Sequence, residues 1–216
     1  MGGALGRDGS IERTRGLYRI LESPVPYSVL QRSLGATRVY RELVTRFLGL
    51  EPGMRVLDVG AGTATLRTVL GDVSYTALEP NPRYVRQMRE RFAGGSETVI
   101  EGTSMAMSEL DGSYDRIIMF ALLHHLDDGA ATAAFQRAAE LLAPDGRVVT
   151  LDNGFHPGQG RISRFLAKID RGANVRRYDG YADLARPFFD SVRVDVTTDL
   201  LRVPYSHVWT VCDGPR

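Results

Sequence analysis

The alternation of strand-like and helix-like segments constrains the fold of this chain more than any other feature of its sequence. Strand patterns lie at 54–60, 75–80, 97–102, 114–123 and 147–152, and helix patterns lie at 81–92 and 128–142. Short turns separate them, such as the one predicted at Pro144–Gly146. Strands and helices that alternate in this way form a parallel sheet with helices on both faces. We therefore expect an α/β fold with a doubly wound, mostly parallel sheet.

The two ends of the chain depart from this alternation. After a predicted helix at 179–187, two strand patterns follow closely, at 191–198 and 206–212. Strands joined by a short connection pair antiparallel, so the sheet is expected to close with a C-terminal antiparallel hairpin. Residues 14–50 read as helical, with a break at two prolines. We expect an N-terminal helical cap over 1–50, followed by one domain over 51–216.

Composition narrows the classes of protein that the chain can belong to. Its 216 residues are 43% hydrophobic, which is enough for one sizeable core. The formal net charge of +1 gives no overall attraction to nucleic acid or membranes. The apolar run Ile117–Leu123 is too short to span a bilayer, and Cys212 alone cannot form an internal disulfide. We expect a cytoplasmic monomer or homodimer with no nucleic-acid or membrane partner.

A glycine turn follows the first strand pattern, in the stretch "VLDVGAGTATL" at Val56–Leu66. Gly60 permits a tight turn, and Gly62 lets backbone N–H groups approach a ligand where a helix begins. Thr65 replaces the third glycine of the dinucleotide-binding fingerprint. Glu79 ends the second strand pattern, where a carboxylate can accept both ribose hydroxyls. These residues by themselves suit NAD and S-adenosylmethionine (SAM) equally.

Other features separate these two cofactors. Asp58 precedes the glycines, where an acid can help hold a cationic amino group, and Ser104 and Met105 follow the third strand, where they can contact an adenine. "FALLHHLDD" follows the fourth strand, and the chain closes with a hairpin instead of a second mononucleotide-binding half. As a set, these features over residues 35–213 resemble the class I SAM-dependent methyltransferases. The portion 153–211 resembles bacterial small-molecule methyltransferases.

The resemblance implies a seven-stranded sheet, SAM as the cofactor, and a role for each matching residue. The glycine turn passes close to the methionine moiety, whose carboxylate suits the start of a helix near Ala64. Glu79 holds the ribose, and Asp58 helps bind the amino group. The residues that the resemblance places at the cofactor are Asp58, Gly60, Ala61, Gly62, Glu79, Pro80, Ser104, Met105, Phe120 and Ala121.

His124 and His125 are the candidate catalytic residues. A histidine has a suitable pKa to act as a general base near neutral pH. Adjacent residues that leave a strand cannot both point at one spot. In the competing structural interpretation, a histidine ring satisfies backbone groups while Asp127 or Asp128 caps the next helix. Both interpretations stay open at this point.

The segment 153–177 is predicted to be a lid over the substrate. Within it, "RISRFLAKID" can form a short helix whose apolar face needs a surface to cover, and the mouth of the site is the nearest one. That face comprises Ile162, Phe165, Leu166 and Ile169. The candidate substrate-binding residues, here and in the N-terminal region, are Tyr18, Tyr27, Gln31, His156, Arg161 and Arg164.

The expected activity is methyl transfer from SAM to O, N or C of a small molecule. A SAM-binding protein repurposed for other chemistry or for regulation would carry the same cofactor pocket, and an NAD-dependent oxidoreductase is the third alternative. Spaced Cys/His ligands are lacking, so no metal is expected, although Asp127, Asp152 and Asn153 make a carboxylate-rich metal site conceivable.

Overall fold

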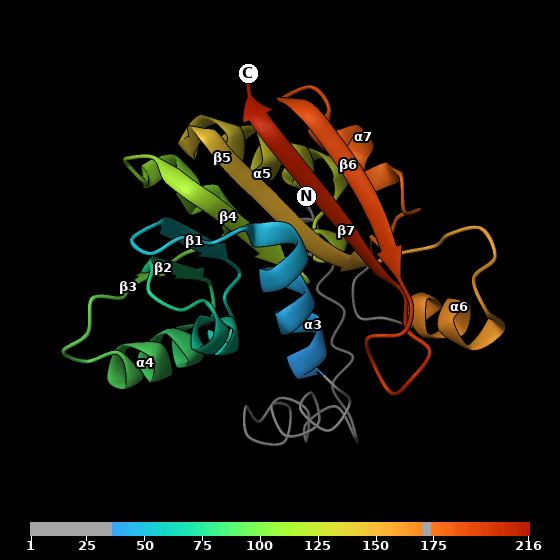
Figure 1. The fold of residues 1–216 in the computed structure, drawn as a ribbon, viewed down its shortest axis with the longest axis horizontal. Coiled ribbons are helices and arrows are strands. Elements are labelled where there is room, and N and C mark those ends of the chain that lie inside the picture. Colours follow the sequence, from blue (N-terminus) through green and yellow to red (C-terminus); the bar gives the residue numbers. More distant parts are fainter. Residues whose placement is uncertain (1–35, 170–173) are drawn as a thin grey trace, which may run out of the picture.

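A seven-stranded sheet organises the molecule, and its strand order is β3-β2-β1-β4-β5-β7-β6 (Figure 1). The structure is a computed structural model that describes residues 36–169 and 174–216. The strands are β1 (Arg55–Val59), β2 (Ser74–Glu79), β3 (Thr98–Glu101), β4 (Tyr114–Phe120), β5 (Leu142–Asn153), β6 (Phe189–Thr197) and β7 (His207–Pro215). Strands β1 to β5 pair in parallel, whereas β7 pairs antiparallel with both β5 and β6. The predicted mostly parallel sheet with a closing hairpin is confirmed.

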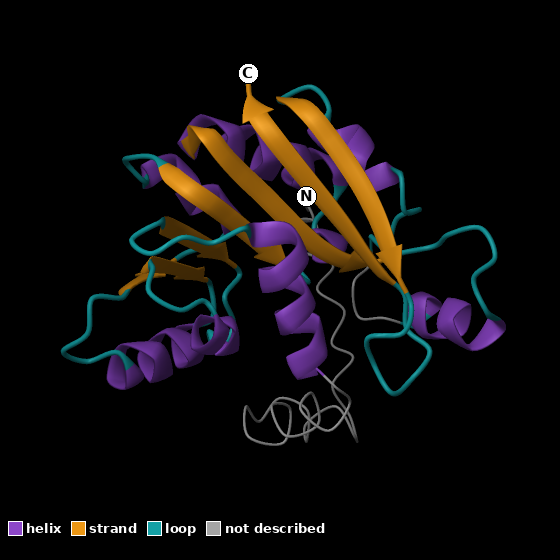
Figure 2. Cartoon of the chain, in the orientation of Figure 1, coloured by secondary structure: helices purple, strands orange, loops and turns teal. Residues whose placement is uncertain are grey.

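Helices flank the sheet on both faces (Figure 2). The α-helices are α3 (Ala36–Glu42), α4 (Pro82–Arg91), α5 (Asp128–Leu141), α6 (Arg161–Lys168) and α7 (Gly180–Ala185). Shorter helical segments are η1 (Leu43–Leu48), η2 (Thr65–Val69), η3 (Ser104–Glu109) and η4 (Leu123–His125). Asn81 caps α4 as its sequence predicts, because its side chain accepts the N–H of Arg83 at 3.0 Å and Pro82 occupies the first turn. No helix within the described ranges is long and apolar enough to cross a bilayer.

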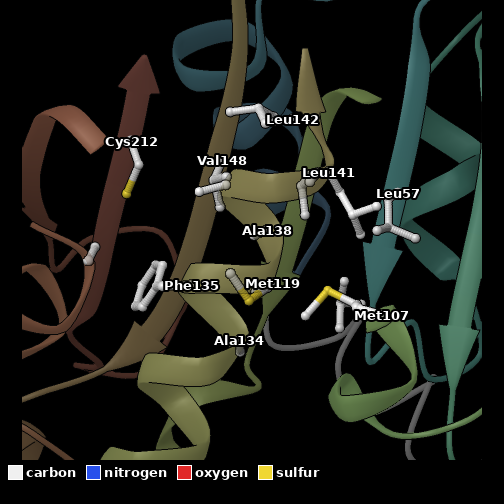
Figure 3. Close-up of a cluster of buried hydrophobic side chains, with 14 of the residues drawn as sticks. Leu57, Met107, Met119, Ala134, Phe135, Ala138, Leu141, Leu142, Val148 and Cys212 are labelled. Atoms are coloured by element: carbon white, nitrogen blue, oxygen red, sulfur yellow. The ribbon is translucent and has the colours of Figure 1, made fainter. Parts of the chain in front are cut away.

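Each face of the sheet has its own hydrophobic core. On the side of α5 and α7, Phe135 packs with Met119, Val148 and Cys212 (Figure 3). On the other side, the Phe47 ring of η1 stacks on Trp209 with the ring centroids 4.5 Å apart. The described part of the predicted N-terminal cap, from residue 36 onward, therefore shares its core with the sheet.

The predicted turn at Pro144–Gly146 lies inside strand β5 as an irregularity. Leu142 pairs with Tyr114, whereas the next pairing joins Arg147 to Arg116. Four residues of β5 therefore lie opposite a single residue of β4, and they bulge out of the ladder. Pro144 and Gly146 thus mark a break in the β4–β5 pairing, but strand β5 begins before them, at Leu142.

Candidate active site

The glycine turn between β1 and η2 is fixed to the end of β2. The N–H groups of Gly60 and Ala61 both donate to the carbonyl of Leu78, at 2.8 and 3.2 Å. Gly60 and Gly62 have φ values of +74° and +57°, which favour glycine. A Cβ at Gly62 would meet nothing within 4 Å, so the turn exposes its backbone to an open space. The turn therefore suits the close approach of a ligand.

The helix predicted near Ala64 differs in type from the expectation. Ala64 has a left-handed φ of 48°, and the segment after it is the five-residue 3-10 helix η2 instead of an α-helix. A helix of this length has a small dipole, because few peptide units are aligned in it. The N–H groups of Gly60, Ala61 and Gly62 already donate to the Leu78 carbonyl and to Glu79, so the turn offers a ligand an open approach more than free donors.

Glu79 joins the glycine turn to the end of β2. Its carboxylate is buried and accepts the N–H of Gly62 at 2.7 Å and the N–H of Asn81 at 2.9 Å. A carboxylate offers about four acceptor positions, so two are left for the hydroxyls of a ribose. Pro80, which follows, is exposed. The predicted placement of Glu79 beside the turn agrees with this geometry.

Asp58 lies in the interior beneath the turn. The hydroxyl of Tyr75 on β2 donates to its Oδ2 at 2.6 Å, and both side chains are almost fully buried. Burial raises the pKa of Asp58 to about 7, the Tyr75 hydrogen bond opposes this shift, and the charge of Glu79 adds to it. Sequence reasoning missed Tyr75, because the two residues are brought together only when β1 and β2 pair.

Ser104 and Met105 lie in the first turn of η3, directly after β3. Met105 is 62% exposed, although it is a large apolar side chain. Its backbone N–H donates to the Thr103 side chain at 3.3 Å, which fixes the start of the short helix. An exposed thioether at the carboxyl end of β3 suits contact with a flat aromatic base.

Phe120 and Ala121 end strand β4. The Phe120 ring is half-buried, and its centroid lies 5.4 Å from that of Tyr40 on α3. Ala121 has φ of 54°, and its N–H donates to the carbonyl of Leu151 at 2.6 Å. A left-handed alanine is an uncommon backbone conformation that is concentrated at functional sites.

His124 and His125 have different environments. His124 is buried, and its ring Nδ1 lies 2.7 Å from Oδ1 of Asp152 on β5. Its backbone N–H donates to the same oxygen at 3.0 Å. His125 is exposed, with its ring centroid 4.1 Å from that of His124. The predicted helix cap is also present, since Asp127 accepts the N–H of Ala130 at 2.8 Å.

The predicted lid helix forms as α6, but its apolar face is not covered. Ile162, Phe165 and Ile169 are 63%, 59% and 59% exposed. The buried residues of α6 are Ser163 and Ala167. These three side chains are therefore not buried against the rest of the described chain, and the capping of the site by α6 stays a prediction.

The predicted substrate-binding residues of this segment make contacts within it. Nε2 of the His156 ring lies 3.0 Å from the Ser206 hydroxyl. The side chain of Arg161 is exposed. The guanidinium of Arg164 lies 5.6 Å from the centre of the Phe155 ring. Their substrate roles stay predictions. Tyr18, Tyr27 and Gln31 lie outside the described residues.

Arg176 is a residue whose role the sequence did not indicate. Its guanidinium donates to the carbonyls of Leu123 and Leu126, each at 2.8 Å, and pairs with Asp128 at 2.8 Å. The N–H of Asn174 also donates to the carbonyl of His124, at 3.0 Å. The end of the 153–177 segment is therefore bound to the histidine turn η4.

The described residues contain no group of three or more His, Cys, Asp or Glu side chains that could hold a metal ion. SAM fits the cofactor residues, because Glu79 keeps free acceptor positions and the backbone at Gly62 is open. The Asp58 side chain is almost fully buried and its Oδ2 accepts the Tyr75 hydroxyl, so only Oδ1 is left to bind a cofactor.

The sheet order and the glycine turn tied to an acid at the end of β2 define a class I SAM-dependent methyltransferase. A family model described as a methyltransferase domain matches residues 31–175, so the chain belongs to this family. The family's cofactor is SAM.

Curated relatives and solved structures agree with this assignment. Cyclopropane mycolic acid synthase 2 of Mycobacterium leprae is 31% identical over 130 residues, which are 53% of this chain and 42% of the relative. Ribosomal RNA small subunit methyltransferase C of Chromohalobacter salexigens is 31% identical over 150 residues, which are 67% of this chain and 45% of the relative. The chain thus spans about half the length of these curated relatives. The N-methyltransferase NodS of Bradyrhizobium japonicum, in complex with S-adenosyl-L-homocysteine (SAH), superimposes with a TM-score of 0.72 at 14% identity, covering 93% of this chain and 97% of NodS.

Proposed function

We propose that this chain transfers the methyl group of SAM to an O, N or C atom of a small-molecule acceptor in the cytoplasm. The main support is the position of the His124–Asp152 pair next to the glycine turn. A Cβ at Gly60 would lie 3.2 Å from the side chain of Leu122, so the loop after β4 touches the turn. His124 follows Leu122 by two residues and contacts Asp152 on the neighbouring strand β5, which supports an acceptor site on the same side as the turn.

The residues of the chain act chiefly by binding and orientation. SAM supplies an electrophilic methyl group, and alignment of two reactants can contribute about 7–11 kcal/mol. A carboxylate at Nδ1 of His124 favours the tautomer with its proton on that nitrogen, so Nε2 becomes the basic atom. His124 then removes the proton of an acceptor that still carries one, and Asp152 positions it.

The distribution of charge favours a small-molecule acceptor over nucleic acid. The net charge is +1, and several arginines of the sheet region are paired with carboxylates, for example Arg67 with Glu97 and Arg147 with Asp213. The exposed cations Arg161, Arg164 and Lys168, which form no ion pair among the described residues, are by contrast confined to the short helix α6. Nucleic-acid binding needs clustered, available cations. One curated relative is a ribosomal RNA methyltransferase, so RNA belongs among the acceptors to be tested.

Two measurements test the proposal. Calorimetry with SAH and with NADH identifies the cofactor, and labelled SAM is then incubated with a small-molecule extract and, separately, with total RNA. We expect SAH binding and label in the small-molecule fraction. NADH binding without SAH binding supports an oxidoreductase, and SAH binding with no label in any fraction supports a repurposed SAM-binding protein. Transfer of the label to RNA contradicts the proposed acceptor class.

A further inference from the structure

Helix α6 presents its apolar side to solvent. Ile162, Phe165 and Ile169 are each more than half exposed, whereas the inward side chains are the small Ser163 and Ala167. A surface helix normally buries its apolar stripe against the core. The orientation of α6 is the reverse, so its apolar stripe is available to a partner.

The exposed side of α6 is both apolar and basic. The three apolar residues are spaced i, i+3 and i+7, so they form one stripe along the helix. At about 100° per residue, Arg161, Arg164 and Lys168 form a second stripe that flanks the first. All three cations are exposed, and they form no ion pair within the part of the chain that the structure describes.

Polar contacts hold α6 in this orientation. The hydroxyl of Ser163 lies 2.7 Å from that of Ser206, which precedes β7. The amide of Gln159 donates to Ser163 at 3.1 Å and to the Gly154 carbonyl at 3.2 Å, and His156 contacts Ser206. Rotating the helix inward would break these bonds and would replace two small buried residues with larger ones. The outward stripe is therefore fixed by the fold.

Charge decides between the possible occupants of this surface. Residues 1–35 of the chain carry five arginines and three acids, so they do not complement a basic stripe. A second copy packed antiparallel about a two-fold axis would bring the same basic stripe against itself. An anionic lipid surface offers acyl chains to the apolar stripe and phosphates to the basic one.

We propose that α6 docks the protein on an anionic membrane surface. Ile162, Phe165 and Ile169 enter the boundary between headgroups and acyl chains, while Arg161, Arg164 and Lys168 bind lipid phosphates. In Figure 1, α6 lies beyond the carboxyl end of β5, which is where Asp152 stands. Docking would thus bring this edge of the sheet close to the lipid. The expectation of no membrane partner was based on the net charge of the whole chain, whereas the proposed contact depends on a local cluster of three cations on α6.

Sedimentation of the full chain with vesicles tests the proposal. We expect binding to equimolar phosphatidylglycerol–phosphatidylcholine vesicles, much weaker binding to pure phosphatidylcholine, and release by salt. Phe165→Ser and Ile169→Ser should each weaken binding about tenfold, because an inserted apolar side chain is lost. Arg161→Glu with Lys168→Glu should abolish the preference for anionic vesicles.

Matched control variants distinguish docking by α6 from non-specific binding of the protein to vesicles. Met105→Ser removes an equally exposed apolar side chain elsewhere, and Arg86→Glu reverses an exposed charge on α4, so neither should change vesicle binding. Thermal unfolding checks that each variant is folded. Failure of the parent protein to bind anionic vesicles, or equal losses in the α6 and control variants, overturns the proposal. A dimer that dissociates in Phe165→Ser shows instead that the stripe binds a second copy.

Discussion

Oδ1 of Asp152 accepts two hydrogen bonds from His124, one from the ring Nδ1 at 2.7 Å and one from the backbone N–H at 3.0 Å. One buried oxygen therefore fixes both the orientation of the ring and the start of the turn η4. The second oxygen, Oδ2, has no hydrogen-bond partner among the described residues. Because β4 and β5 are parallel neighbours, this contact joins the two strand ends at which acceptor chemistry is proposed.

Asp152→Asn is expected to lower the free energy of unfolding by about 1–3 kcal/mol, since bonds to a charged acceptor become bonds to a neutral one. Methyl transfer should fall, while the affinity for SAH stays the same, because Asp152 lies outside the predicted cofactor residues. Urea denaturation and calorimetry measure the two effects. Asp145→Asn, at an exposed position in the β5 bulge, is the control. A large loss of SAH affinity in Asp152→Asn would contradict the assignment.

Arg176→Met is expected to loosen the histidine turn. The guanidinium satisfies the carbonyls of Leu123 and Leu126, and its loss leaves them without their charged donor. We expect a loss of about 1–3 kcal/mol in stability and faster amide hydrogen exchange in residues 123–126. Hydrogen exchange followed by mass spectrometry measures the local effect.

The neighbouring arginine provides the control for this change. The Arg177 side chain is 72% exposed, and it pairs with Asp179 at 3.1 Å. Exposed ion pairs contribute about 0–1 kcal/mol, so Arg177→Met should leave exchange at the histidine turn unchanged. Similar exchange rates in the Arg176 variant and in the parent protein would show that Arg176 does not hold the turn.

Periodicity and turn residues were enough to predict the sheet and most of its helices. The strand pattern and the Asn81 cap are local signals, and the structure confirms both. The partners of the site residues could not be predicted, because Tyr75 reaches Asp58, and Asp152 reaches His124, only across strand pairings. Such contacts between strands can be predicted only when the register in which the strands pair is known.

The structure confirms a helix at α6 but leaves its apolar face exposed, where the sequence suggested a covered one. The spacing of its apolar residues indicates a helix with an apolar face, but it does not say what that face contacts. The deciding signal is Ser163, which bonds to Ser206, a residue 43 positions away in the chain. A polar pairing of this kind has no periodicity and leaves no pattern in the sequence.

Asp58→Asn is expected to stabilise the protein in a pH-dependent way. The folded-state pKa of Asp58 is about 7, above its ordinary value of 3.8. The folded state thus keeps a proton that the unfolded state releases, and its relative stability falls as pH rises from about 4 to 7. Asparagine keeps an acceptor for Tyr75 and carries no charge. The variant should gain up to about 4 kcal/mol over the parent above pH 7, and almost nothing near pH 4. Urea denaturation across this range, without SAM, checks the trend, which a constant difference would contradict.

Glu79→Ala is expected to weaken SAH binding by about 1–3 kcal/mol, because the ribose hydroxyls and the Gly62 N–H lose a charged acceptor. Glu79→Gln should have a smaller effect, since its amide keeps one acceptor oxygen but presents an NH₂ group to the N–H of Gly62 or Asn81. Glu101→Ala is the matched control, because Glu101 pairs with Glu79 in the β2–β3 register and is exposed. Calorimetry with SAH measures the three affinities. Unchanged affinity in a folded Glu79→Ala protein, or an equal loss in Glu101→Ala, would remove Glu79 from the cofactor site.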